Sequence, residues 1–177
     1  EQAIRRRKNE PVDDIPKGEF LMVSVGSLIP RKGFERLIHI CGLLKSRGYR
    51  FHLLILGKGE LYEQLAEQVI DEHLLDSVQL LGFRDNPYPY MAAADLYVCP
   101  SYVEGFSTVV SEAVVLETPV VTTDCSGMRE ILGDSEGLRT MLDKPEVYQY
   151  YQQRVRERAP FFYMEERLKA YEEILDQ

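Results

Sequence analysis

Five short apolar segments alternate along the chain with segments whose apolar residues recur at helical spacing. The apolar segments span residues 20–26, 51–57, 77–82, 95–100 and 119–124. In the first intervening segment, Phe34, Leu37, Ile38 and Cys41 recur three or four positions apart, as on one face of a helix. Continuous apolar runs are typical of strands buried on both faces, and their alternation with helices is typical of a parallel sheet covered on both sides. The sequence therefore predicts a doubly wound, Rossmann-like α/β fold.

The two ends of the chain depart from this alternation. Residues 1–18 are polar and hold the basic run 5–8, so we interpret them as a linker or a truncated edge, with the basic run as a solvated surface. Residues 19–177 are interpreted as one domain. Beyond Gly133 the sequence turns helical without a further apolar segment of this kind.

Composition narrows the class of protein. The chain has 177 residues, of which 45% are hydrophobic, enough for one folded domain with a real core. A formal net charge of -8 argues against a nucleic-acid surface. Three cysteines, Cys41, Cys99 and Cys125, lie in apolar stretches without metal-ligand spacing, which indicates buried thiols and no disulfide framework. We find neither a bilayer-spanning run nor a signal-peptide pattern, and expect a cytoplasmic protein.

Ligands of doubly wound sheets bind outside the carboxyl ends of the strands, where the strand order reverses. The polar loops that follow the five predicted strands should therefore meet at one edge of the sheet. These loops span residues 27–33, 57–59, 83–85, 100–107 and 124–130.

The loop after the fourth strand carries the strongest candidate chemistry. Glu104 and Glu112 stand eight positions apart, the second of them on an otherwise apolar helix where a carboxylate needs a partner. Between them, Gly105 allows close approach of the backbone to a ligand, and Ser107 can cap the helix. The free amides and dipole of a helix start attract phosphate. Arg31 and Lys32, after the first strand, add cations that could neutralise a diphosphate.

Residues 103–121, VEGFSTVVSEAVVLETPVV, closely resemble the signature of group 1 glycosyltransferases of the retaining family 4. The resemblance runs from about Phe20 to Leu132. Beyond Gly133 it leads us to expect a sixth strand that the helical sequence there lacks, so either that strand is deleted or residues are absent near Ser135. It implies the GT-B fold, with this chain as the C-terminal, donor-binding domain. It also implies a donor that is a nucleotide diphosphate-sugar, UDP- or GDP-linked, and no metal ion or further cofactor. Consistent with this, the chain contains no Asp-x-Asp sequence.

The resemblance assigns roles to residues in this chain. Glu104 would contact the donor sugar, Lys32 and Arg31 the leaving diphosphate, and Glu112 the ribose hydroxyls. Among the remaining donor-binding candidates, Phe83 and Arg84 would contact the base through their backbone, and residues 106–108 would bind the distal phosphate. The full set of these candidates is Gly26, Ser27, Gly57, Phe83, Arg84, Gly105, Phe106, Ser107 and Thr108. One departure stands out, because Ser27 and Leu28 occupy a place where relatives commonly have an arginine. Arg31 is the candidate to replace it.

The predicted function is sugar transfer from a nucleotide diphosphate-sugar in polysaccharide or glycolipid synthesis. A GT-B active site lies between two domains, and a chain of 177 residues is long enough for only one of them. We therefore expect nucleotide binding without transfer, an N-terminal acceptor domain as the missing partner, and peripheral membrane association of the full-length enzyme.

Two other classes share the alternation of strands and helices. A nicotinamide-dependent oxidoreductase would need Gly-x-Gly-x-x-Gly after the first strand, where this chain has Gly26, Ser27 and Leu28. A receiver-like signalling module would need clustered acids there, and this chain has Arg31 and Lys32 instead. Both alternatives remain open at the level of sequence.

Overall fold

The structure of the protein, a computed structural model, describes residues 4, 7–12, 14–105, 107–123, 125 and 145–158. The strands are β1 (Phe20–Val25), β2 (Phe51–Leu56), β3 (Val78–Gly82), β4 (Leu96–Cys99) and β5 (Val120–Thr122). The helices are η1 (Pro30–Lys32), α2 (Phe34–Ser46), α3 (Tyr62–Asp71), α4 (Tyr88–Ala93), α5 (Thr108–Val115) and α8 (Pro145–Arg158). All five predicted strands are confirmed, with ends that differ by at most two residues.

The sheet has the order β3-β2-β1-β4-β5, and every described pair of neighbouring strands is parallel. The chain moves outward from β1 to β2 and β3, then returns to place β4 on the other side of β1. The strand order therefore reverses between β1 and β4. The predicted parallel, doubly wound sheet is confirmed, and this reversal marks the edge at which a ligand site is expected.

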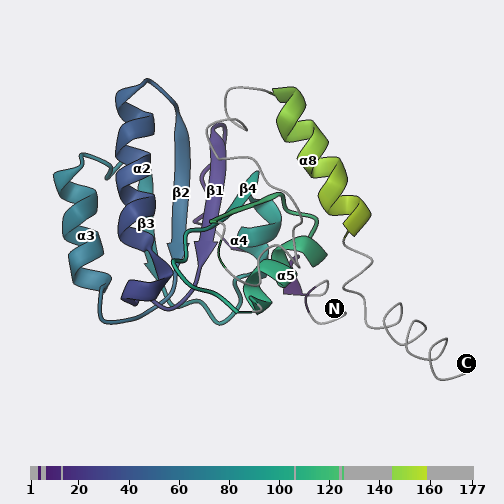
Figure 1. Ribbon diagram of the computed structural model, residues 1–177, viewed down its shortest axis with the longest axis horizontal. Helices are drawn as coiled ribbons and strands as arrows, with labels where there is room; N and C mark the ends of the chain where they lie inside the picture. Colours follow the sequence, from purple (N-terminus) through teal and green to yellow (C-terminus); the bar gives the residue numbers. More distant parts are fainter. Residues whose placement is uncertain are drawn as a thin grey trace, which may run out of the picture.

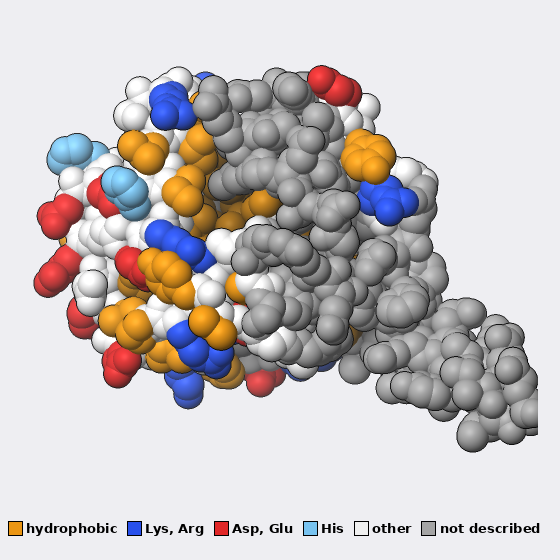
Figure 2. Space-filling model, in the orientation of Figure 1, with side chains coloured by type: hydrophobic (Ala, Val, Ile, Leu, Met, Phe, Trp, Pro, Cys, Tyr) orange, Lys and Arg blue, Asp and Glu red, His pale blue; other side chains and the backbone are white. Residues whose placement is uncertain are grey.

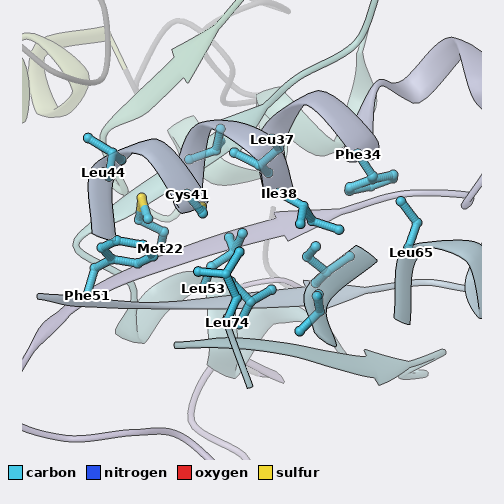
Figure 3. Close-up of a cluster of buried hydrophobic side chains, with 14 of the residues drawn as sticks. Met22, Phe34, Leu37, Ile38, Cys41, Leu44, Phe51, Leu53, Leu65 and Leu74 are labelled. Atoms are coloured by element: carbon cyan, nitrogen blue, oxygen red, sulfur yellow. The ribbon is translucent and has the colours of Figure 1, made fainter. Parts of the chain in front are cut away.

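Helices cover both faces of the sheet, with α2 and α3 on one side and α4 and α5 on the other (Figure 1). Side chains of β1 alternate between the two cores: Met22 packs with α2 and α3, while Leu21 and Val23 pack with α4 and α5. Figure 3 shows Met22 in the first core, where α2 brings Phe34, Leu37, Ile38, Cys41 and Leu44 against the strands. Each such fully buried side chain contributes about 1.5–3 kcal/mol to folding.

The strand β3 differs from the prediction of burial on both faces. It lies at an edge of the described sheet, and only Val78 is fully buried while Gln79 is exposed. An edge strand has one neighbour and is covered less completely, which explains the mixed pattern. The sequence pattern could not show which strand would be outermost.

Several expectations concern the ends of the chain. The described part of residues 1–18 packs on the domain, with Ile4, Val12 and Ile15 against the second core. The predicted helix after residue 144 is present as α8, where Arg156 lies 3.8 Å from Glu117. The expected sixth strand and the predicted helical sequence after residue 158 fall outside the described residues.

The cysteines of the described chain are free thiols, as predicted. Cys41 and Cys99 are buried, and burial raises the pKa of the Cys41 thiol to about 12. Cys125 is only partly buried. Within the described ranges, none of the helices has the length and apolarity needed to cross a bilayer.

Gly33 joins the first strand-end loop to α2. Arg31 and Lys32 precede α2 and form a turn of their own, η1, which ends at Gly33 with a left-handed φ of 66°. An added Cβ at Gly33 would lie 2.3 Å from the carbonyl oxygen of Pro100, at the end of β4. The loops after β1 and β4 thus touch backbone to backbone.

Replacing Gly33 with alanine should destabilise the protein more than replacing Gly48, which also has a positive φ (86°) but an open surrounding. Both changes carry the left-handed penalty of about 1–2 kcal/mol. Gly33→Ala adds a steric cost of about 1–3 kcal/mol from the contact with Pro100. Urea unfolding of both variants measures the difference. If the two variants lose equal free energy of unfolding, the contact between the two loops does not require glycine at residue 33.

Candidate functional site

A pocket of about 320 Å³ opens at the carboxyl edge of the sheet. It is lined by Val25, Gly26, Ser27, Leu56, Gly57, Lys58, Phe83, Arg84, Asp85, Pro87, Tyr88, Val109 and Glu112. These residues come from the ends of β1 and β2, the loop after β3, and the helices α4 and α5. Six of the predicted site residues therefore line one cavity: Gly26, Ser27, Gly57, Phe83, Arg84 and Glu112.

The floor of the pocket is made of strand ends in close backbone contact. The amide of Gly26 donates to the carbonyl of Leu56 at 3.0 Å, and the amide of Gly57 donates to Gly82 at 2.9 Å. A Cβ on Gly57 would lie 1.8 Å from the carbonyl oxygen of Gly26. Only glycine fits there, so the loops after β1, β2 and β3 form one continuous surface.

Glu112 has the partner that its position on an apolar helix requires. The hydroxyl of Tyr88, at the start of α4, donates to Glu112 Oε1 at 3.1 Å. Burial raises the pKa of the Glu112 carboxyl, and the hydrogen bond from Tyr88 offsets part of that effect. The carboxylate keeps oxygen lone pairs for a ligand in the pocket. Sequence analysis predicted that Glu112 needs a partner but did not identify Tyr88.

Phe83 presents an exposed aromatic ring in the lining of the pocket. Its side chain is 60% exposed, and the ammonium of Lys58 lies 5.0 Å from the ring centroid. The neighbouring Arg84 instead directs its guanidinium to Tyr90 at 3.2 Å and Asp14 at 2.9 Å. The predicted role of Phe83 and Arg84 through their backbone is compatible with this arrangement, because both line the pocket while the Arg84 side chain has other partners.

Lys32 and Glu104 form an ion pair beside the pocket floor. Glu104 is only 6% exposed and accepts a second hydrogen bond from Ser101 Oγ at 2.8 Å. Burial raises the pKa of Glu104, but the bonds from Lys32 and Ser101 and the charge of Arg31 outweigh it, so the pKa lies below its ordinary value. Lys32 Cδ lies 3.9 Å from the Cβ position of Gly26, which places the pair next to the cavity.

Arg36 holds the loop that carries Glu104 against α2. Its Nε donates to the carbonyl of Pro100 at 2.6 Å, and its Nη2 donates to Ser101 at 2.6 Å. Its guanidinium lies 4.1 Å from the ring centroid of Tyr102, whose amide donates to the carbonyl of Arg31 at 2.9 Å. Sequence analysis did not single out Arg36. Its target is a pair of main-chain carbonyls distant in sequence, which leaves no local motif.

Arg31 lies apart from Lys32 although the two are adjacent in sequence. It is exposed and lines a second, open groove of about 420 Å³ together with Pro30, Glu35, Leu61, Gln64 and Tyr102. Its charge still reaches Glu104, where it lowers the carboxyl pKa. The structure therefore places Arg31 within electrostatic range of the site but outside the lining of the main pocket.

The start of α5 is formed as predicted. Ser107 Oγ accepts from the amide of Val110 at 3.4 Å and so caps the helix. Gly105 and Thr108 are exposed on either side of this cap, and Phe106 lies outside the described residues. Since α5 also carries Val109 and Glu112 into the pocket, its amino end and the cavity belong to the same region.

The described residues contain no cluster of three or more His, Cys, Asp or Glu side chains able to hold a metal ion. On the face in Figure 2, acidic side chains spread along the edge formed by α3, and the described part of that face shows basic side chains singly or in small groups. The site in the described residues is therefore a pocket lined by Glu112, with the Lys32–Glu104 ion pair beside it.

Comparison with known proteins agrees with this geometry. The family model described as "Glycosyl transferases group 1" matches residues 5–153. An N-acetylgalactosaminyltransferase of Campylobacter jejuni, named for its diphospho-undecaprenol-linked acceptor, is 34% identical over 167 residues, which are 85% of this chain and 45% of that protein. An amylovoran biosynthesis glycosyltransferase of Erwinia amylovora is 31% identical over 140 residues, 68% of this chain and 34% of that protein.

Solved structures show the same fold. Anabaena HepE in complex with UDP-glucose superposes with a TM-score of 0.67 at 25% identity, covering 81% of this chain and 44% of that one. A TarM variant of S. aureus, in complex with fondaparinux, alpha-GlcNAc-glycerol and UDP, gives a TM-score of 0.74 at 20% identity over 95% of this chain and 38% of that one. The chain spans less than half the length of each of these relatives. Its sheet and helices match one Rossmann-like portion of GT-B glycosyltransferases, and the chain belongs to the group 1 glycosyltransferase family.

Proposed function

We propose that this chain is the donor-binding domain of a retaining, metal-independent family 4 glycosyltransferase that uses a UDP-linked sugar. One observation carries the proposal: a single pocket joins the loops of three strand ends to Glu112, and the Lys32–Glu104 pair lies beside its floor. The pocket would hold the nucleoside, and a diphosphate leaving it toward the start of α5 would meet Lys32. The other half of the proposed enzyme would bind the acceptor.

The nucleoside is held by groups at both ends of the pocket. Glu112, oriented by Tyr88, would accept hydrogen bonds from the ribose hydroxyls, a task that suits a fixed carboxylate. The backbone at Phe83 and Arg84 would meet the edge of the base. UDP and GDP are both compatible with this set of groups. We favour UDP because HepE, at 25% identity, was solved with UDP-glucose in a matching fold.

The diphosphate would lie between Lys32 and the first turn of α5. Backbone amides of a first helical turn lack intrahelical partners and favour an anion, and Lys32 supplies a full positive charge. When the bond between the sugar and the diphosphate breaks, negative charge grows on the leaving phosphate. Fixed donors at that position stabilise the transition state more than the ground state. Arg31 adds to the positive field from its neighbouring groove.

Glu104 would face the donor sugar. In the described structure it is paired with Lys32, so binding of the diphosphate would give Lys32 a second anionic partner. The Glu104 carboxylate then has oxygen atoms available for sugar hydroxyls. The names of the relatives point to surface polysaccharides and glycolipids as the products of the whole enzyme.

The first test is titration of the wild-type chain and of Lys32→Ala with UDP, uridine, GDP, ADP and NAD by calorimetry. We expect UDP to bind most tightly to the wild type. Lys32→Ala should weaken the binding of UDP about 10- to 100-fold, since a hydrogen bond to a charged group contributes about 1.5–3 kcal/mol. Uridine, which has no phosphate, should be affected little.

The matched control is Lys17→Ala, which removes the same charge just before β1, at the opposite edge of the sheet. It should bind UDP like the wild type. Wild-type protein that binds none of the nucleotides, or that prefers NAD, would overturn the proposed function. Equal losses of UDP and uridine in Lys32→Ala would remove the lysine from the phosphates.

Glu112→Gln should weaken uridine about 3- to 10-fold at pH 7, because a neutral acceptor is about half as strong as a charged one. Burial raises the Glu112 pKa, so in the wild type this advantage should fade as the pH falls from 7 toward that raised pKa. Glutamine does not titrate, and the variant should show no such fading. Calorimetry with uridine at several pH values measures both curves, and parallel curves would exclude Glu112 as the ribose acceptor.

Glu104→Gln should affect UDP and UDP-sugar in opposite ways. Removing a negative charge beside the diphosphate should strengthen UDP binding by about 2- to 5-fold through the weakened like-charge repulsion. The same change replaces a charged acceptor for sugar hydroxyls with a weaker, neutral one, so any preference of the wild type for UDP-glucose over UDP should shrink. Competition binding with the two ligands gives the ratio. A variant that loses UDP affinity as strongly as Lys32→Ala would contradict this assignment.

A further inference from the structure

Residues before β1 lie directly on the loop that forms one wall of the pocket. We call residues 83–88 the rim loop; its members Phe83, Arg84, Asp85, Pro87 and Tyr88 line the pocket. Three of its side chains, from Arg84, Asp85 and Asn86, bond to residues between 7 and 14. These partners are about 70 to 80 positions away in sequence, so the contacts are tertiary.

The inner contact is a three-membered group of Asp14, Arg84 and Tyr90. Asp14 Oδ2 accepts from Arg84 Nη2 at 2.9 Å, and Asp14 Oδ1 accepts from the hydroxyl of Tyr90 at 2.7 Å. Arg84 Nε in turn donates to the Tyr90 hydroxyl at 3.2 Å. The bond from Tyr90, followed by that from Arg84, holds the pKa of Asp14 below its ordinary value against the effect of burial. The group is therefore ionised and closed at neutral pH.

The outer contact lies closer to the solvent. Arg7 Nη2 donates to Asp85 Oδ2 at 2.7 Å and to the Asp85 carbonyl at 3.3 Å. Asn86 Nδ2 donates to the carbonyl of Arg7 and to Glu10 Oε2, both at 2.8 Å. Single exposed ion pairs contribute little to stability, about 0–1 kcal/mol, so the importance of these bonds lies in what they orient.

The same segment reaches the ribose end of the pocket. The guanidinium of Arg7 lies 6.0 Å from the ring centroid of Tyr88, the residue that donates to Glu112. Val12 and Ile15 anchor the segment by packing against the core formed with α4 and α5. The described residues between 7 and 14 thus contact the proposed base end of the pocket through Arg84 and its proposed ribose end through Tyr88.

We propose that residues 7–14 are a clamp that positions the rim loop for nucleoside binding, with Asp14 and Arg7 as positioning residues. The proposal rests on the proposed nucleotide function of the pocket. A loop that must be ordered on binding costs about 1–2 kcal/mol for each backbone residue fixed, and a loop already held avoids that cost. The clamp acts on the base and ribose end, whereas the diphosphate end is formed by Lys32 and α5.

This division gives the test. Asp14→Ala should weaken both UDP and uridine by about 5- to 30-fold, which corresponds to losing ordering worth about 1–2 kcal/mol. Inorganic pyrophosphate, which needs only the other end of the site, should bind as it does to the wild type. General loosening of the fold would weaken all three ligands together, so the pattern separates positioning from a merely structural effect.

The matched control is Asp76→Ala, which removes a carboxylate that pairs with Lys45 just before β3, away from the pocket. It should leave UDP and uridine within about twofold of wild type, as expected for an exposed ion pair. Asp14→Glu should restore part of the lost uridine affinity because it keeps the charge. Should Asp14→Ala fail to fold, Tyr90→Phe removes the hydroxyl that donates to Asp14 while preserving the buried ring, and should show the same ligand pattern more weakly.

The outcomes separate the two proposals. Wild-type protein that binds no nucleotide contradicts the proposed function itself. If the wild type binds UDP but Asp14→Ala and Tyr90→Phe bind UDP and uridine as tightly as Asp76→Ala does, the clamp is overturned. The proposed nucleotide function is not affected by that result. Loss of pyrophosphate in parallel with uridine also overturns the clamp. Selective loss of uridine and UDP supports it.

Discussion

The site depends on backbone-to-backbone contact between loops that leave neighbouring parallel strands. At Gly57 a side chain would collide with the carbonyl of Gly26, and at Gly33 with the carbonyl of Pro100. These two contacts join the loops after β1, β2 and β4 without intervening side chains. The polar groups carried by those loops consequently have fixed separations. A site for an extended ligand such as a nucleotide diphosphate needs such spacing, because its recognising groups come from four separate parts of the chain.

Within that frame, the principal charged groups are already partnered by protein atoms. Lys32 has Glu104, Glu112 has Tyr88, and Arg84 has Asp14. Burying an unpaired charge is costly, so these partners stabilise the site in the folded protein. Bonds to these partners also restrict the rotamers of the side chains. A ligand would therefore meet an ordered set of donors and acceptors, and part of the ordering cost of binding is already met during folding.

The five strands of the described sheet and the helices between them could be predicted from the sequence, because buried parallel strands appear as continuous apolar runs and helices as periodic ones. Positions at the strand ends were also predictable, which is why Gly26, Gly57, Phe83 and Glu112 line one pocket as expected. The side chains that bond to these site residues and their loops could not be predicted. Tyr88, Arg36 and Asp14 act through contacts with residues 24, 64 and 70 positions away, respectively, which no local motif encodes. Gly33 similarly separates Arg31 from α2, and of the two adjacent cations Arg31 lines the second groove while Lys32 pairs with Glu104.

The position of β3 explains why the rim loop, of all the loops at this edge, draws on residues from before the first strand. The loops after β1 and β2 each have a neighbouring strand end on both sides, whereas β3 is the outermost strand on its side of the described sheet. Its following loop has strand support on one side only, through the bond from Gly57 to Gly82. The segment 7–14 supplies contacts that no further strand provides there, and its bonds go to Arg84, Asp85 and Asn86, beyond the last hydrogen bond of the sheet. The need for support at the base end of the pocket thus follows from the topology. The loop after an edge strand has a neighbouring strand on one side only, so another part of the chain must hold it if it is to keep a fixed position.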